Sequence, residues 1–158
     1  MPRTRECLIV NAPSNVQIEP FAVTDGPALL EMYQTPSSGA SFVCSHPQVV
    51  TPIEDLEASK VVEVEGRTID SFEFDAVDLI KLDIQGAEYP ALVGARQTIL
   101  RHRPVIMVEE KAASVQKVGA AVNAAQAESI KETAALLRSY GMTAKEKAQT
   151  DRVYVFED

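Results

Sequence analysis

The stretch that decides the fold is "AVDLIKLDIQGAEYPALVGARQTILRHRPVIMVEE", residues 76–110. Its first part, 76–84, is a nearly continuous apolar run interrupted at Lys81, which predicts a strand buried on both faces. Residues 88–100 repeat apolar side chains at the three-to-four spacing of a helix face. A second apolar run, 104–110, follows after a crossover of about 20 residues, so the stretch predicts a βαβ unit with parallel strands and a right-handed connection.

The residues after this unit predict a helix and a hairpin. Apolar positions from Ile130 to Leu137 share one helix face, and Gly141 stands where a glycine ends a helix. Residues 142–158 indicate two strands around a turn at Thr150–Asp151, and such a hairpin must be antiparallel. The alanine-rich residues 111–128, which lie between the βαβ unit and this helix, predict a mobile helix or lid.

The residues before the βαβ unit give weaker signals. Residues 16–23 predict a short strand, and residues 29–52 predict loop with short extended pieces because of their Pro, Ser and Gly content. An extended segment is expected around Val61–Val64 and is expected to break at Gly66. Without an internal repeat or a linker, residues 1–158 are predicted to form a single α/β domain with a mostly parallel sheet and a C-terminal antiparallel hairpin.

Composition excludes several classes of partner. The chain has 158 residues and a formal net charge of -8, and no cluster of Lys and Arg suits a phosphate backbone or an anionic membrane surface. The densest basic spot, Arg101–Arg103, is interpreted as a solvated helix end. No segment reaches the roughly 18 apolar residues of a membrane helix. Cys7 and Cys44 lack metal-type spacing and the start lacks a secretory leader, so a cytoplasmic location is expected.

Acidic residues end both strands of the predicted parallel pair. Asp83 ends the first, and Glu109 and Glu110 end the second. Ligands of open α/β sheets bind beyond the carboxyl ends of the strands. With a strand spacing of ~4.8 Å, the acids should lie about 5–10 Å apart. Successive side chains of a strand point to opposite faces, so only one of the two glutamates should point into the crevice. The sequence does not show which one.

Two further residues, Gly86 and Glu88, follow the first strand closely in the sequence. Gly86 permits a tight turn and a close approach to the backbone. Glu88 fits two interpretations equally, as a functional acid or as a charge that favours the first turn of its helix. Carboxylates in this place could bind a ligand ammonium, orient hydroxyls, accept a proton or hold a divalent ion.

The stretch from Phe74 to Glu110 resembles the signature of the FkbM-type methyltransferases. That signature is a strand ending in Lys-x-Asp-x-(Glu or Gln)-Gly-x-Glu, a helix with a Leu and a Gly-Ala, then Arg-Pro and an apolar strand ending in Glu. The preceding Asp70 also matches the family pattern. The matching residues are Lys81, Asp83, Gln85, Gly86, Glu88, Leu92, Gly94, Ala95, Arg103, Pro104 and Glu109.

The resemblance implies a fold and an activity. The family is similar to class I S-adenosylmethionine-dependent methyltransferases, whose Rossmann-like sheet ends in an antiparallel strand. The implied reaction is methyl transfer to a hydroxyl of a sugar or small-molecule acceptor. By this resemblance Asp83, Glu88 and Glu109 are the catalytic candidates, with no metal. Asp83 would also lie beside the methionine end of the cofactor or the acceptor oxygen, and Ala22 and Val23 would lie near the adenine.

The chain departs from the family pattern at its beginning. The glycine-rich cofactor loop and the acid that holds the ribose are not found, and residues 1–15 resemble the helix after the family's second strand. The first two strands of the usual fold are therefore expected to be missing. The strand at 76–84 would then form an exposed edge, covered by a local segment, a second copy of the chain or a partner chain. The chain alone is expected to bind the cofactor poorly.

Two alternatives remain open at this stage. One is a non-catalytic binding or assembly module that retains the methyltransferase fold. The other is a metal-dependent enzyme, in which the acid cluster would hold Mg²⁺ or Ca²⁺ because histidines are scarce.

Overall fold

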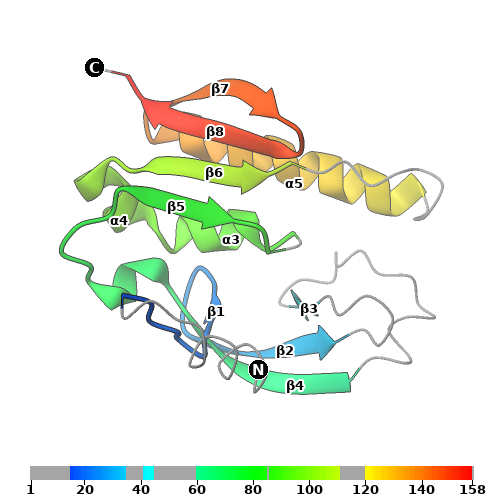
Figure 1. Ribbon diagram of the computed structural model, residues 1–158. Coiled ribbons are helices and arrows are strands. Elements are labelled where there is room, and N and C mark those ends of the chain that lie inside the picture. The colour runs from blue at the N-terminus through cyan, green and yellow to red at the C-terminus, as the bar shows by residue number, and fades with distance from the viewer. Residues whose placement is uncertain (1–14, 35–40, 45–59, 85, 111–119, 158) are drawn as a thin grey trace.

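The computed structural model describes residues 15–34, 41–44, 60–84, 86–110 and 120–157. They form two four-stranded sheets and a layer of helices (Figure 1). Residues 1–14 of the predicted helix and the first part of the predicted lid, 111–119, fall outside the described residues. The elements are β1 (Ala22–Val23), β2 (Ala28–Gln34), β3 (Ser41–Cys44), β4 (Lys60–Arg67), the 3-10 helix η1 (Ile69–Phe72), β5 (Leu79–Leu82), α3 (Glu88–Val93), α4 (Arg96–His102), β6 (Val105–Glu109), α5 (Ala120–Ser139), β7 (Met142–Ala148) and β8 (Asp151–Phe156).

The predicted βαβ unit and hairpin are confirmed. The second sheet has the order β5-β6-β8-β7, and β5 and β6 are parallel in the register Leu79↔Val105 to Leu82↔Val108. The antiparallel β7–β8 hairpin follows α5, and Gly141 has a φ of 88° just beyond the helix. Helices α3 and α4 therefore lie in the crossover between two parallel neighbours, as the two apolar runs indicated.

The prediction of one mostly parallel sheet is wrong. Of the strand pairings in the described residues, only β5–β6 and β1–β4 are parallel. The other sheet has the order β1-β4-β2-β3, in which β2 pairs antiparallel with both β3 and β4. In the second sheet the hairpin lies directly beside β6, and this adds antiparallel pairs.

The first sheet also corrects three local predictions. Residues 28–34, expected to be irregular, form β2, and only Ala22–Val23 of the predicted strand 16–23 is extended in a sheet. Strand β4 does not break at Gly66. An added Cβ at Gly66 would lie 2.9 Å from Thr24 Cγ2 and 3.0 Å from Leu30 Cδ1, so glycine lets the strand continue beneath these side chains.

The predicted helix 88–100 is interrupted at Gly94. An added Cβ at this position would lie 2.1 Å from the carbonyl oxygen of Thr24. The Gly94 carbonyl also accepts a hydrogen bond from the Asp70 N–H at 2.9 Å. The chain therefore turns between α3 and α4 where the helical layer meets the segment that leads out of the first sheet.

Asp70 caps the helix that restarts after this turn. Its carboxylate accepts hydrogen bonds from Gln97 N–H at 3.0 Å and Thr98 N–H at 2.8 Å, and from the Thr98 hydroxyl at 2.8 Å. Orphan N–H groups at a helix start are commonly satisfied by a nearby side-chain oxygen. Here the oxygen comes from η1, about 27 residues earlier in the chain.

Replacing Asp70 with alanine should lower the free energy of unfolding by about 2 kcal/mol, because it leaves two N–H groups and the buried Thr98 hydroxyl without their acceptor. Urea unfolding followed by circular dichroism measures this change. The control is Asp75→Ala, an exposed acid five residues later whose loss should change stability by less than about 0.5 kcal/mol. Equal effects of the two substitutions would contradict the capping role.

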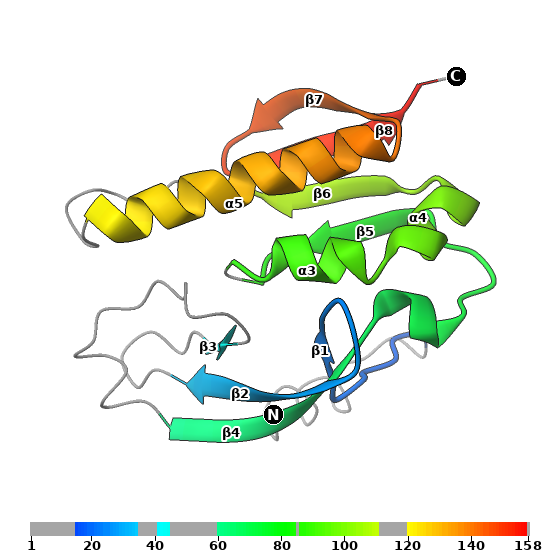
Figure 2. The ribbon, with the colours of Figure 1, turned by 180° about the vertical axis from the view of Figure 1, so that it is seen from behind.

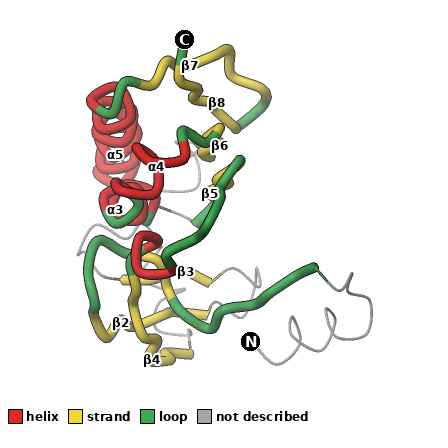
Figure 3. Tube along the Cα trace, turned by 90° about the vertical axis from the view of Figure 1, so that its left-hand side faces the viewer, coloured by secondary structure: helices red, strands yellow, loops and turns green. Residues whose placement is uncertain are grey.

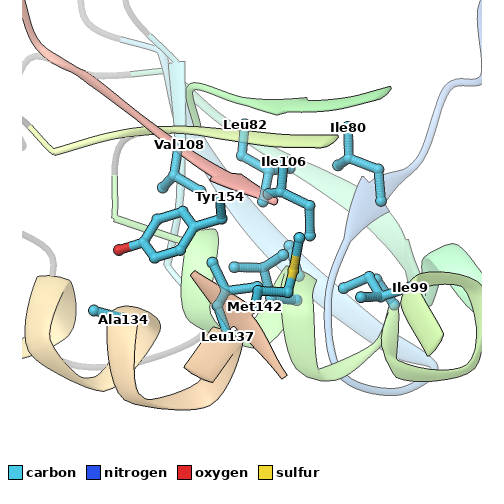
Figure 4. Packing of buried hydrophobic residues seen from close by; sticks show 12 residues of the cluster. Ile80, Leu82, Ile99, Ile106, Val108, Ala134, Leu137, Met142 and Tyr154 are labelled. Carbon is cyan, nitrogen blue, oxygen red and sulfur yellow. The ribbon is translucent and has the colours of Figure 1, made fainter. Parts of the chain in front are cut away.

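The main core lies between the second sheet and the helices. Helices α3, α4 and α5 cover one face of this sheet (Figure 2), and the edge-on view shows them gathered on that side (Figure 3). Ile80 and Leu82 of β5 point into this core with Ile106 and Val108 of β6 (Figure 4). The other buried members of the cluster are Ala91, Leu92, Ala95, Ile99, Ala134, Leu137, Met142 and Tyr154.

Strand β5 is covered on one face only. Its burial alternates, with Leu79 and Lys81 exposed and Ile80 and Leu82 buried. The prediction of burial on both faces is wrong, because no described helix lies on the second face. β5 also ends the sheet order within the described residues, and Leu79 is 56% exposed. The predicted exposed edge is confirmed for this part of the chain.

Candidate site at the ends of strands β5 and β6

Asp83 and Glu109 lie at the same end of two neighbouring parallel strands. The register pairs Leu82 with Val108, so each acid is one residue beyond the last paired position. Both follow a buried residue, and alternation places both on the face that the helices leave open. The predicted juxtaposition of the strand tips is therefore confirmed.

The structure decides between the two glutamates that the sequence left open. Glu110 is buried, with 7% of the residue exposed. Its carboxylate accepts a hydrogen bond from the Tyr154 hydroxyl at 2.9 Å and forms an ion pair with Arg152 Nε at 3.1 Å. Glu110 thus holds the hairpin against β6, and Glu109 is the glutamate that shares the open face with Asp83.

A lysine joins the acids on this face. Lys81 Nζ lies 2.8 Å from Asp151 Oδ1, which connects β5 to the start of β8 across the intervening strand β6. The hydrogen bond with Asp151 raises the pKa of Lys81 above its usual value. Desolvation opposes this rise, and the charges of Asp151, Asp83 and Glu109 add to it. The group of three carboxylates and one ammonium therefore carries net negative charge.

Asp151 is the member of this group that sequence analysis missed. It lies about 70 residues from Lys81 and entered only as a turn residue of the hairpin. Its place is set by the β6–β8 register, which pairs it with Glu109. The order of strands cannot be read from local sequence, so no local signal linked Asp151 to the site.

Glu88 has a defined structural contact. It is 7% exposed, and its Oε1 accepts a hydrogen bond from Ile84 N–H at 3.1 Å. This bond closes the turn after β5, in which Gly86 has a φ of 98° that favours glycine. Glu88 therefore shapes the backbone beside Asp83, and its catalytic role stays a prediction.

Ala22 and Val23 do not share a sheet with the acids. They form β1, which pairs with Gly66 and Arg67 of β4 in the first sheet. Val23 is partly buried and packs against the core cluster of the second sheet. Their predicted contact with the adenine of the cofactor stays a prediction.

Two kinds of feature are absent from the described residues. Within the described ranges, no group of three or more His, Cys, Asp and Glu side chains is arranged to hold a metal ion. The metal-dependent alternative therefore gains no support from this part of the chain. No described helix combines the length and apolar character needed to cross a bilayer.

The fold is an α/β unit whose neighbouring acids follow the ends of two parallel strands, which is the edge where open α/β sheets bind their ligands. The family model of the methyltransferase FkbM domain matches residues 2–143. The chain therefore belongs to the FkbM methyltransferase family, as its motif indicated.

One solved structure is similar in fold to this chain. The methyltransferase FkbM from Methylobacillus flagellatus KT is similar to this chain with a TM-score of 0.49 and 16% sequence identity. The match covers 98% of this chain and 32% of that protein, so the chain spans about a third of its length. No curated protein sequence matches the chain.

Proposed function

We propose that the chain takes part in S-adenosylmethionine-dependent methyl transfer to a hydroxyl of a sugar or small-molecule acceptor. The observation that carries this proposal is the position of Asp83 and Glu109, each one residue beyond the last β5–β6 register pair, Leu82↔Val108. Membership of the FkbM family supports a methyltransferase. The acceptor class rests on the resemblance and on the ability of carboxylates to accept hydrogen bonds from hydroxyls.

The charge of the site suits this cofactor. S-adenosylmethionine carries a sulfonium and an ammonium group, and Asp83, Glu109 and Asp151 outnumber the single cation Lys81. When bound, the cofactor supplies an electrophilic methyl group. Asp83 or Glu109 would accept the proton that the acceptor hydroxyl loses as its oxygen bonds to that methyl carbon and the carbon–sulfur bond breaks. Glu88 would keep the turn beside Asp83 in place through Ile84.

Calorimetric titration of the chain with S-adenosylhomocysteine tests the proposal. We expect weak, submillimolar binding that Asp83→Asn reduces about tenfold, as for the loss of one charge-assisted contact. The control is Asp78→Asn, an exposed acid at the opposite end of β5, which should leave the affinity unchanged. Equal affinities of the wild type and Asp83→Asn would remove Asp83 from the cofactor site. Absence of binding would mean that this chain alone does not form that site.

A second candidate function is a non-catalytic assembly module. The observation that favours it is the position of β5 at the end of its sheet within the described residues, together with the exposed side chain of Leu79. Open strand edges are common routes of association. The occupant under this hypothesis is a second copy of the chain or a partner chain.

Light scattering at increasing concentration tests self-association through this edge. We expect a dimer that Leu79→Lys converts to a monomer without loss of helical content, because a charge at an edge opposes pairing. Leu100→Lys is the control, since Leu100 is also exposed but belongs to α4. A wild type that remains monomeric at all concentrations would contradict self-association.

A further inference from the structure

Three carboxylates lie in a row across the open face of the second sheet. Glu109 of β6 pairs directly with Asp151 of β8, and Asp83 stands beside Glu109, one residue beyond the last β5–β6 pair. Tyr154 of β8 is buried in the core under the helices, so alternation places Asp151 on the same open face as the other two acids. Like charges on directly opposite positions of a sheet repel each other, so a nearby cation stabilises this row.

A cation on this face, Lys81, pairs with the more distant end of the row. Lys81 and Asp83 lie on the same strand, with about 7 Å between their Cα atoms. Asp151 belongs to β8, two strands away, which is about 10 Å across the sheet at the usual strand spacing. The Lys81 Nζ nevertheless lies 2.8 Å from Asp151 Oδ1, so this side chain crosses β6. The ammonium is therefore held at the β8 end of the row and away from the β5 end.

The alternative position of the ammonium is close by. Lys81 and Asp151 are both partly exposed, with 39% and 27% of their side chains accessible, so their ion pair is screened by water. The hydrogen bond with Asp151 is the largest cause that raises the pKa of Lys81, and the charges of Asp83 and Glu109 are smaller causes that act in the same direction. Because a lysine side chain is long and flexible, loss of Asp151 would let the ammonium turn back along β5 toward Asp83.

We propose that Asp151 is a positioning residue of the candidate site, which holds the Lys81 ammonium over β8 and so prevents it from neutralising Asp83. This inference rests on the proposed function, in which Asp83 and Glu109 bind a ligand that carries an ammonium or sulfonium group. A lysine ammonium beside Asp83 would compete with that ligand for the same carboxylate. With the ammonium held at Asp151, the β5 end of the row keeps a negative potential that attracts a cationic ligand.

Titration of Lys81 by NMR in the ligand-free, 158-residue chain tests where the ammonium lies. Asp83→Asn, Asp151→Asn and the double variant form a double-mutant cycle. In the wild type, Asp83→Asn should lower the pKa of Lys81 only slightly, because the ammonium is bound to Asp151. In the Asp151→Asn background the same substitution should lower it much more, because the ammonium now pairs with Asp83. Simple loss of charge acts additively, so equal effects in the two backgrounds would overturn the proposal.

Calorimetry with S-adenosylhomocysteine tests the consequence for the ligand. We expect Asp151→Asn to weaken binding about fivefold, as for the loss of one exposed ion pair. Lys81→Met should change the affinity little in the wild type, but in the Asp151→Asn background it should restore the affinity to within about twofold of the wild type. An affinity that Lys81→Met does not restore would overturn the proposal, because Asp151 would then act on the ligand without Lys81.

Glu157→Gln is the matched control. It removes an ion pair of similar length, from Lys145 Nζ to Glu157 Oε1 at 2.9 Å, beyond the opposite end of β8. This variant should change neither the pKa of Lys81 nor the affinity, and circular dichroism checks that each variant is folded. The titration needs no ligand. Absence of S-adenosylhomocysteine binding would therefore contradict the proposed cofactor site of this chain, while the titration would still confirm or overturn the role of Asp151.

Discussion

Replacing Gly94 with alanine should lower the free energy of unfolding by about 3 kcal/mol or more, which is at the upper end for overpacking a tight site. The new Cβ would lie 2.1 Å from the Thr24 carbonyl oxygen and 3.1 Å from its carbonyl carbon. These are backbone atoms, so the contact cannot be relieved by a change of rotamer. The helix break would have to move away from the first sheet. Chemical unfolding in urea, followed by circular dichroism, measures the loss.

Gly26→Ala is the matched control for this prediction. Nothing lies within 4 Å of a Cβ added at Gly26, so this substitution should change stability by less than about 0.5 kcal/mol. The two variants add the same methyl group to nearby parts of the chain and differ in what it meets. Similar stabilities of Gly94→Ala and the wild type would show that the close contact with Thr24 is not maintained in solution.

Replacing Glu110 with alanine should destabilise the protein by about 3 kcal/mol, because two groups that interact with this buried carboxylate lose their partner. The Tyr154 hydroxyl would lose its acceptor beside the core, and Arg152 would lose its ion pair. Glu110→Gln retains an acceptor for Tyr154 and should cost only about 1 kcal/mol. If the two variants proved equally stable, the hydrogen bond to Tyr154 would make no measurable contribution to the free energy of unfolding.

The pH dependence of stability gives a separate test of the environment of Tyr154. Burial, followed by the hydrogen bond to Glu110, raises the pKa of Tyr154 from 10.0 to about 12. The folded state therefore favours the protonated phenol, and its contribution to stability is complete below about pH 10 and is lost as the pH rises toward 12. Tyr154→Phe cannot ionise at this position, so its stability should fall less steeply over that interval. Equal slopes would contradict the raised pKa.

Much of the second sheet could be predicted because its signals are local. Two apolar runs separated by a helical pattern specify parallel neighbours, and a glycine followed by two short strands specifies a hairpin. The meeting of Asp83 and Glu109 follows from this topology alone. Where the acids end up depends on strand order, which is why Asp151 could not be assigned to the same group in advance.

The remaining features depend on contacts between distant segments. Gly94 looks like an ordinary helix residue until Thr24 is known to lie against it. Glu109 and Glu110 are equivalent in sequence, and only the position of Tyr154 shows which one is buried. The strand at 28–34 was missed because Pro, Ser and Gly in the following residues suggested loop, whereas pairing with β4 determines its conformation.

The junction of Asp70, Gly94 and Thr24 has a consequence for how the molecule opens. The amide of Asp70 and its carboxylate both bind the helical layer, so α4 loses its cap when the segment leaving the first sheet separates. The amides of Gln97 and Thr98 should then exchange with solvent deuterium at the rate at which that segment detaches. Fluctuations of two separate sheets would in this way be joined into one cooperative unit.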